Sequence, residues 1–447
     1  MFCLRQIQIE GLIVQRCTRI QNAEWDRLGK AVVHRPGVEA FFGILDPSAS
    51  LYNKPFNLNS AQAEHDEMVR VLKDQFGIMA VRLKDSLIGS ANSNKSIKNR
   101  LQSIASKRIA YSGDAVSARA ARREMRVNLN SYGSDYLFDA ALLNPNVRVK
   151  SYNGNITAST TLKNPISNMY FMRDQQIITD RGVFISRMSK LQRQGETDIV
   201  RLFWDSIKLP ISGVAQKPAF IEGGDYMPMN DFAIIGTGRR TNLSGAKQLI
   251  SNALNFDEVA IVRSPENEML PKAYADQMID MHLDTYFNVA GSATIVGSKY
   301  MLESSRLQTY VRERKGEYKK SGGTTSLYKY IIGKGFNLID IPIIEQLSYA
   351  TNFLCIRDGT ILAVDEIPIL KKTLEYISGK AKGNPSIYGR LLKHIRAEYA
   401  KIRGRNGIFP NNNQSRENGL DAYTVSLTNL TGGYGGAHCM TTAFGRA

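Results

Sequence analysis

Apolar residues recur along this chain in two patterns, one typical of short buried strands and one of amphipathic helices. A helix is predicted over 61–75, where apolar side chains return at intervals of three and four residues. Short apolar runs bounded by turn residues predict strands on either side of this helix, at 30–34 and 78–83. Strands that alternate with helices in this way indicate an α/β fold.

From residue 166 onward one unit recurs, in which two short strands joined by a turn are followed by a helix and a further strand. The predicted elements are the strands 169–172 and 182–186 with the helix 196–207, the strands 219–221, 232–235 and 259–262 with the helix 243–254, the strands 281–284, 293–296 and 338–341 with the helix 325–332, and the strands 352–356 and 360–364. Repetition of one such unit favours a radially arranged or stacked fold. Acidic residues or a histidine stand where the first strand of each of the first three units ends. Strand ends that converge on a common axis would therefore bring these polar residues together.

Two helical stretches depart from the repeat. Residues 85–160 are predicted to form a polar, basic helical insertion subdomain, and residues 367–405 a basic helical insertion within the fourth unit. The remaining body, 22–84 and 161–447, would be the catalytic α/β domain. The first residues, 1–21, are predicted to be an N-terminal extension.

The excess of basic over acidic residues is concentrated in these helical stretches. The net charge is +17, from 58 Lys and Arg against 41 Asp and Glu. Segment 92–126 holds nine basic and two acidic residues, and segment 371–405 holds ten and two, so together they carry 15 of the 17 excess charges. Neither has the interleaved aromatic residues that base stacking needs. We therefore interpret both as solvated helical surfaces and do not expect nucleic acid as a partner.

Composition further narrows the class of protein. No apolar run reaches the roughly 18 residues of a membrane span, and the first residues lack the pattern of a signal peptide. We expect a soluble, cytoplasmic protein with no membrane contact. The four cysteines are scattered without a CxxC pair, and there are only five histidines. We therefore expect neither a disulfide framework nor a metal site.

The polar residues at the predicted strand ends belong to types that act together in one kind of chemistry. They are Asp174, Glu222 with Asp225, and His282 with Asp284, and a further candidate, Cys439, follows a glycine-rich segment near the end of the sequence. Each alone has a plain structural interpretation, such as a turn residue or a satisfied histidine, and only their co-occurrence favours a catalytic centre. Carboxylates placed at two angles can hold a planar guanidinium. A thiolate can attack the guanidinium carbon while a histidine transfers protons.

The segments that carry these residues resemble arginine deiminase, within the guanidine-modifying superfamily of deiminases, dihydrolases and amidinotransferases. They are Asn168–Asp174 (NMYFMRD), Phe220–Asp225 (FIEGGD), Met281–Thr285 (MHLDT) and His438–Thr441 (HCMT), in the family's order and with similar spacing. The resemblance covers roughly 23–365 and 410–445. It implies a five-bladed, pseudo-symmetric α/β propeller built from ββαβ units, with a helical insertion.

The resemblance also implies a role for each candidate residue. Cys439 would attack the guanidinium carbon of L-arginine, while Asp174 and Asp284 hold the guanidinium nitrogens. His282, oriented by Glu222, would protonate the leaving ammonia and then deprotonate the attacking water, giving citrulline without a cofactor or metal. The implied substrate-binding residues are Asn168, Phe171, Arg193, Asp225, Arg240 and Gly436, of which the two arginines would hold the α-carboxylate. Because three buried carboxylates are costly without a cation, the empty site should hold cations or extra protons.

Departures from the family's pattern leave the substrate and the acceptor open. Arginine deiminases commonly carry an arginine in the glycine-rich loop shortly before the cysteine, and Tyr434 stands at about that place here. Segment 38–60 differs from the lid-like segment of bacterial members, and 367–405 is an unusual insertion. The alternatives are an amidinotransferase and a deiminase of another guanidine, such as agmatine. A distant alternative is a protein that binds nucleic acid or an acidic partner. We also expect a homo-oligomer, a dimer or a tetramer.

Overall fold

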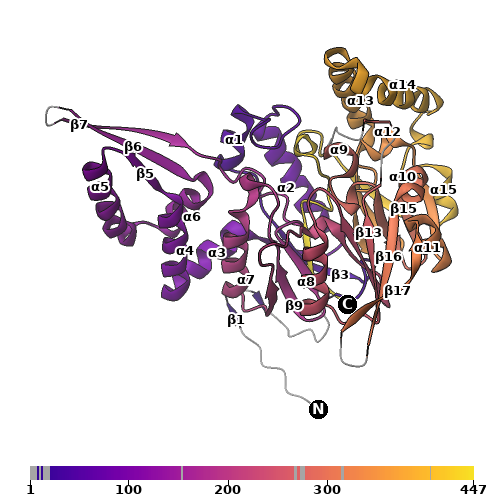
Figure 1. Cartoon of the computed structure of the whole chain (residues 1–447), viewed down its shortest axis with the longest axis horizontal. Helices are drawn as coiled ribbons and strands as arrows, with labels where there is room; N and C mark the ends of the chain where they lie inside the picture. The colour runs from indigo at the N-terminus through magenta and orange to yellow at the C-terminus, as the bar shows by residue number, and fades with distance from the viewer. Residues whose placement is uncertain are drawn as a thin grey trace.

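The computed structural model describes residues 8–9, 12–13, 21–152, 155–265, 269–271, 277–313, 317–402 and 404–447. The predicted N-terminal extension lies outside the described residues, apart from Gln21 and the short paired strands β1 (Gln8–Ile9) and β2 (Leu12–Ile13). The rest is a mixed α/β structure (Figure 1), as predicted. None of its described helices combines the length and apolar character needed to cross a bilayer.

Five small sheets of the described chain share one pattern of three strands. In each, the middle strand pairs antiparallel with one neighbour and parallel with the other. They are β22 (Thr442–Arg446), β3 (Leu28–Val33) and β4 (Met79–Arg82); β8 (Gln176–Thr179), β9 (Gly182–Ile185) and β10 (Ile211–Val214); β11 (Tyr226–Pro228), β12 (Phe232–Thr237) and β13 (Glu258–Arg263); β14 (Phe287–Gly291), β15 (Thr294–Gly297) and β18 (Asn337–Asp340); and β19 (Leu354–Arg357), β20 (Thr360–Val364) and β21 (Asp421–Val425). Because β22 is the last strand of the chain and pairs with β3, the two ends of the described fold meet in one sheet.

Helices connect the second and third strands of these sheets. They are α1 (Val38–Leu45), α2 (Leu58–Asp74), α7 (Glu196–Ser206), α8 (Leu243–Ala253), α10 (Lys299–Ser304), α11 (Leu327–Gly333) and α15 (Asn413–Glu417), with the short α9 (Gln277–Asp280) and α12 (Ile343–Gln346) in the loops between sheets. The predicted helices over 61–75, 196–207, 243–254 and 325–332 correspond to α2, α7, α8 and α11. A hairpin that was not predicted, β16 (Arg306–Arg312) with β17 (Tyr318–Thr325), extends the β11–β12–β13 sheet on its β13 side.

The three predicted first strands at 169–172, 219–221 and 281–284 are wrong. Segments 169–172 and 281–284 lie in turns, and 219–221 is irregular with a single β-bridge between Ile221 and Arg187. The true first strands, β8, β11 and β14, begin a few residues later. The apolar side chains of Met169–Met172 are buried inside a turn rather than in a ladder. A short buried apolar run therefore has the same sequence appearance in a strand and in a buried turn.

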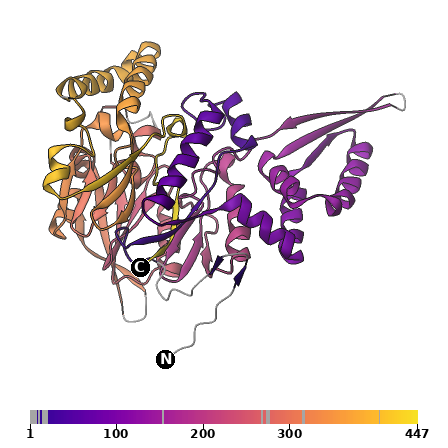
Figure 2. The ribbon, with the colours of Figure 1, turned by 180° about the vertical axis from the view of Figure 1, so that it is seen from behind.

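The insertion after β4 contains more strand than predicted. Its helices are α3 (Leu83–Ser93), α4 (Lys95–Arg108), α5 (Ala115–Asn128) and α6 (Ser134–Leu143), and a sheet of its own is formed by β5 (Ala110–Gly113), β6 (Pro145–Tyr152) and β7 (Asn155–Leu162). Because β7 is exposed along nearly its whole length, it shows no alternation of apolar and polar residues. The insertion projects from one end of the molecule in both views (Figures 1 and 2), and its helices share a hydrophobic cluster with Phe203 and Trp204 of α7.

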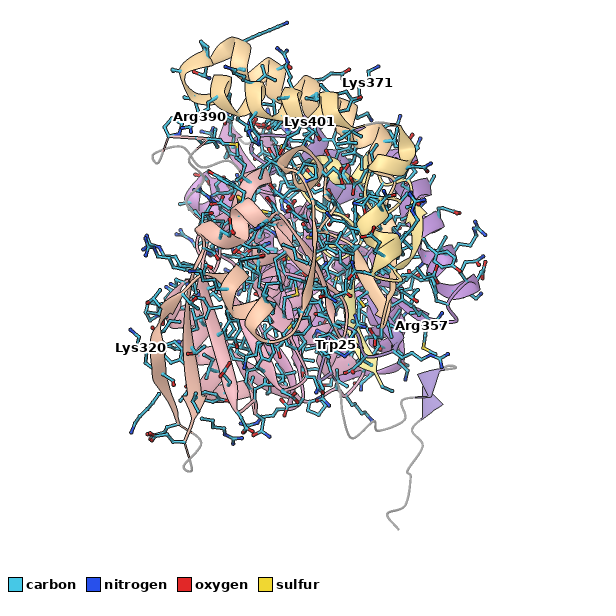
Figure 3. All side chains as sticks on the ribbon, turned by 90° about the vertical axis from the view of Figure 1, so that its right-hand side faces the viewer. Trp25, Lys320, Arg357, Lys371, Arg390 and Lys401 are labelled. Carbon is cyan, nitrogen blue, oxygen red and sulfur yellow. The ribbon has the colours of Figure 1, made fainter. Side chains whose placement is uncertain are left out.

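The predicted basic insertion is a helical hairpin of α13 (Glu366–Gly383) and α14 (Pro385–Lys401), inserted between β20 and β21. We refer to it as the α13–α14 hairpin. Its apolar face, which includes Leu370, Ile377 and Leu391, packs onto the hydrophobic cluster of the body. Lys371 of α13 lies at the far edge of the molecule in Figure 3, whereas Arg390 and Lys401 of α14 line a hollow between the hairpin and the body.

Candidate active site

The candidate residues come from the loops that lead into the first strands of the five sheets. The loop segments are Asp174 before β8, η3 (Gly223–Asp225) with Glu222 before β11, η4 (Leu283–Thr285) with His282 before β14, Asn352 before β19, and Cys439, which follows η6 (Leu430–Gly433), before β22. His282 and Asp284 therefore lie on a 3-10 turn and not on a strand as predicted. The same position in each unit supplies side chains to one centre.

Glu222 and His282 form the most buried pair of this centre. Glu222 Oε2 lies 2.9 Å from His282 Nε2, and both side chains are fully shielded from solvent. The other carboxylate oxygen of Glu222 accepts hydrogen bonds of 2.9 and 3.0 Å from the backbone N–H and hydroxyl of Ser189. Asp174 Oδ1 lies 3.7 Å from Nδ1 on the opposite side of the imidazole. A Cβ at Gly224 would lie 2.8 Å from that nitrogen, so only glycine fits against the ring.

These carboxylates hold the imidazole of His282 in its protonated form. Burial alone would lower the pKa of His282, but the charges of Asp174 and Glu222 raise it to about 9. Burial would likewise raise the pKa of Glu222, whereas the charges of Arg240 and His282 bring it well below its usual value. At neutral pH His282 is therefore a cation that can donate a proton.

Cys439 lies beside a second carboxylate, Asp284. Its Sγ is 3.5 Å from Asp284 Oδ2, which also lies 2.8 Å from Nδ1 of His438. Burial, together with the negative charges of Asp284 and Asp174, raises the pKa of the Cys439 thiol well above its usual value. The free site therefore holds a thiol, and formation of the thiolate requires additional positive charge nearby.

Two arginines of the chain form ion pairs with two of the carboxylates of the site, Asp174 and Glu222. Arg193 Nη1 lies 2.6 Å from Asp174 Oδ2, and its Nη2 lies 2.9 Å from Glu196 Oε2. Arg240 Nη1 lies 3.5 Å from Glu222 Oε2. The expected need of the empty site for cations is thus met by the protein itself. Asp174, Glu222 and His282 lie close enough to share a metal ion, but the two arginines already balance both carboxylates.

Asn168 and Phe171 lie at the cavity of the site, whereas Asp225 and Gly436 support its loops. Asn168 Nδ2 donates a 2.7 Å hydrogen bond to the Ser50 carbonyl. Asp225 Oδ1 accepts a 2.9 Å hydrogen bond from the backbone N–H of Leu283, which fixes the 3-10 turn of His282 and Asp284. Burial raises the pKa of Asp225 to about 7. Gly436 and Asp225 are absent from the residues that line the cavity beside Cys439.

Sequence reasoning missed Asn352, which holds the backbone of the loop that carries Cys439. Its Oδ1 accepts hydrogen bonds from the backbone N–H groups of Gly436 and Cys439, at 2.7 and 3.1 Å. Its Nδ2 donates to the carbonyl of Asp284 at 3.3 Å. One signal could have revealed it, because Asn352 precedes the first strand of the fourth unit, at the place where the other units carry their polar residues.

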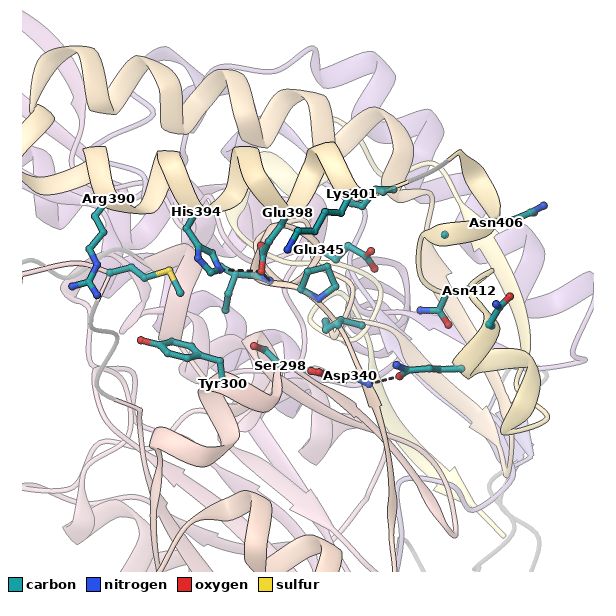
Figure 4. A pocket seen from close by; sticks show the side chains of 18 residues that line it. Ser298, Tyr300, Asp340, Glu345, Arg390, His394, Glu398, Lys401, Asn406 and Asn412 are labelled. Carbon is teal, nitrogen blue, oxygen red and sulfur yellow. Dashed lines mark hydrogen bonds and ion pairs between the residues drawn. The ribbon is translucent and has the colours of Figure 1, made fainter.

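The cavity at Cys439 is closed. It has a volume of about 10 Å³ and is lined by Leu51, Asn168, Phe171, Asp174, Arg193, Arg240, Met281, Gly433, Tyr434 and Cys439. Such a space holds about one water molecule. A much larger hollow of about 910 Å³ lies between α14 and the body (Figure 4), but no predicted site residue lines it. Predicted site residues therefore line the small cavity and not the large hollow, and the small cavity would have to open to admit a substrate.

Comparisons with known proteins place arginine deiminases among the relatives of this chain. A curated arginine deiminase of Halobacterium salinarum is 26% identical to this chain, over 97% of this chain and 98% of its own length. An arginine deiminase of Pediococcus pentosaceus is 23% identical over 77% of this chain and 88% of its own length. A solved structure of AgrE with ornithine and NAD+ has a TM-score of 0.50 at 11% identity, covering 96% of this chain and 40% of that one, which supports a shared fold alone.

A sequence model of the family described as arginine deiminase matches residues 49–446, which include every candidate site residue named above. The members of this family are hydrolases that act on the C–N bonds of linear amidines. This chain belongs to the arginine deiminase family.

Proposed function

We propose that this protein hydrolyses L-arginine to citrulline and ammonia through a covalent intermediate on Cys439. The observation that carries the proposal is one cluster of a buried thiol, a protonated histidine and three carboxylates. Cys439 and Asp174 of this cluster line the small cavity, Asp284 lies 3.5 Å from Cys439 Sγ, and His282 lies between Asp174 and Glu222. A guanidinium has in-plane donors on two edges, and Asp174 and Asp284 would accept from them. The five sheets of equal pattern, with the last strand paired to the first, support a closed five-bladed α/β propeller around this centre.

The substrate would activate its own nucleophile. A guanidinium placed between Asp174 and Asp284 would release Arg193 from Asp174 and free it to bind the α-carboxylate of the substrate. The new positive charge would offset the two carboxylates that, with burial, raise the pKa of Cys439, so that the thiol would release its proton to solvent and the thiolate would form mainly when the substrate is bound. Arg240, which now pairs with Glu222, is the second proposed partner of the α-carboxylate.

The residues then divide the reaction between them. Cys439 Sγ would form a bond with the guanidinium carbon, and the C–N bond to one terminal nitrogen would break. His282 would give its proton to that nitrogen, which leaves as ammonia. The neutral imidazole would next take one proton from water, whose oxygen attacks the same carbon. The C–S bond would then break and return the thiolate, and the second proton of the water would pass to solvent, where the released ammonia takes it up as ammonium.

The test is citrulline and ammonia formation from arginine alone. We expect turnover by the wild type, none by Cys439→Ala, and near wild-type turnover by Cys355→Ala, which removes the other described cysteine, a buried residue outside the cavity. Turnover by Cys439→Ala would refute the covalent mechanism. Release of ornithine only after a second amine is added would instead identify an amidinotransferase.

The choice of arginine over other guanidines is tested at Arg240. Arg240→Ala should lose at least tenfold in kcat/KM for arginine but much less for agmatine, which has no carboxylate, since a lost charged hydrogen bond is worth about 1.5 to 3 kcal/mol. Equal losses for both substrates would mean that Arg240 serves only to balance Glu222.

A further inference from the structure

Two loops cover Cys439 in the closed site. One contains Leu51, and the other runs from Gly433 to Tyr434; all three residues line the cavity together with the thiol. The loops are joined by a hydrogen bond of 2.8 Å from the backbone N–H of Asn53 to the carbonyl of Gly432. Since the cavity beneath them has room for about one water molecule, arginine reaches Cys439 only when at least one loop moves away.

Both side-chain-bearing residues of this cover, Leu51 with φ of 61° and Tyr434, have a strained backbone, and Tyr434 is the one with a contact to the α13–α14 hairpin. The backbone of Tyr434 is left-handed, with φ of 74° and ψ of 36°, a region that residues with a side chain rarely adopt. Such a conformation persists when surrounding contacts hold it. Contacts between the Tyr434 side chain and residues outside its own loop can provide this restraint.

The contact that holds Tyr434 comes from the α13–α14 hairpin. The hydroxyl of Tyr434 lies 3.1 Å from the hydroxyl of Tyr376, which is on α13. Both rings pack against the same hydrophobic cluster, which includes Leu370 and Ile377 of the hairpin. Lys380 lies one turn further along α13, with its Nζ 4.7 Å from the centroid of the Tyr376 ring, so Tyr376 is itself fixed from the hairpin side.

We infer that Tyr376 is a positioning residue that keeps Tyr434 closed over Cys439 in the free protein. The α13–α14 hairpin is then the fixed support of the cover, and the hydroxyl–hydroxyl bond is the contact that breaks when the site opens. The effect of this contact on arginine turnover rests on the proposed function, whereas its effect on the closure over Cys439 is independent of that function. The inference gives a role to an insertion whose basic charge alone indicated none.

The size of the effect follows from the bond. A neutral hydrogen bond contributes about 1 kcal/mol, which corresponds to an open fraction about fivefold larger when it is removed. A reagent that reaches Cys439 only in the open state reacts in proportion to that fraction. Tyr376→Phe removes one hydroxyl and keeps the ring in the hydrophobic cluster, so the hairpin retains its packing.

The experiment measures alkylation of Cys439 by iodoacetamide, without substrate, by mass spectrometry of the peptide that contains it. We expect Tyr376→Phe to react about fivefold faster than the wild type at an unchanged melting temperature. Tyr434→Phe should also react faster than the wild type, and the double variant should be accelerated by less than the product of the two single effects, because all three variants lack the bond between the two hydroxyls. The matched control is Tyr399→Phe, an exposed tyrosine of α14, which should react at the wild-type rate.

Activity provides a second measurement. In Tyr376→Phe we expect kcat/KM for arginine to rise by up to the same factor, because kcat/KM starts from the free enzyme, while kcat stays within about twofold. Wild-type alkylation rates in both Tyr376→Phe and Tyr434→Phe would overturn the inference, as would an equal acceleration in Tyr399→Phe. A wild-type protein that makes no citrulline would refute the proposed function and leave the alkylation result to decide the inference by itself.

Discussion

His282 is expected to keep its proton to a much higher pH than a free histidine. Its ring lies 2.9 Å from Glu222 and 3.7 Å from Asp174, and these charges outweigh the effect of burial. They raise its pKa from 6.5 to about 9. In the proposed reaction this proton is the one that ammonia carries away, so the pKa bears directly on turnover near neutral pH.

The raised pKa of His282 also makes the free energy of unfolding depend on pH. Because the pKa is higher in the folded than in the unfolded chain, the protonated imidazole stabilises the fold fully below pH 6.5, and this contribution is lost as the pH rises through about 9. A shift of this size is equivalent to about 3 kcal/mol of unfolding free energy. Asp225 and Glu345, whose pKa values are each raised to about 7, lose their protons at lower pH.

The direct assay is an NMR titration of the ring resonances of ¹³C-labelled histidines, with the His282 signal assigned by its absence in His282→Gln. We expect its midpoint near pH 9 in the wild type. Glu222→Gln removes one of the three carboxylates that raise the pKa, Asp174, Glu222 and Asp225, so its midpoint should move down by at least one pH unit. A wild-type midpoint at or below 6.5 would refute the reasoning, because burial would then outweigh the carboxylates.

Two further substitutions test the supports of the site. Asn352→Leu leaves the buried N–H groups of Gly436 and Cys439 without their acceptor, at a cost of about 1 to 3 kcal/mol each; we expect a lower urea midpoint and at least a tenfold loss of citrulline formation, and wild-type values for both would contradict this role. Glu24→Gln removes the carboxylate that pairs with Arg173 and Arg446, whose charges hold its pKa at about 2 against the effect of burial. We expect a loss of about 3 to 5 kcal/mol in unfolding free energy, measured by urea denaturation, and an equal loss in Glu124→Gln, an exposed control, would show that the buried pairing is not the cause.

Sequence patterns predicted which candidate residues lie together more accurately than they predicted the strands beside them. The residue types of Cys439, His282 and Glu222 can be recognised in the sequence, because few other combinations of residues can bind and react with a guanidinium. The helices α7 and α8 were also predictable, since an amphipathic helix shows its period locally. The buried turn at Met169–Met172 was not, because burial alone makes a turn and a strand equally apolar.

Other features depend on contacts between residues far apart in the chain. Arg193 pairs with Asp174 across 19 residues, and Asn352 holds the N–H of Gly436 across 84 residues. The pairing between Tyr376 and Tyr434 joins an insertion to the catalytic loop across 58 residues. No local period encodes such contacts, although the repeat itself pointed to the position of Asn352.

The closed cavity and the charges within it restrain the same thiol by different means. Asp284 and Asp174 keep Cys439 protonated, and only a ligand that brings positive charge between them can reverse that effect. The cover formed by Leu51 and Tyr434 blocks access to Cys439 sterically, and it excludes every ligand until it opens. A neutral alkylating reagent also needs the thiolate, but the protonation of Cys439 is common to the wild type and Tyr376→Phe, so the ratio of their rates reports the cover. In the proposed reaction arginine would have to overcome both restraints and compete with Arg193 for Asp174. The two restraints together would confine the nucleophile to cationic guanidines, and this selectivity would come from the empty site rather than from the bound complex.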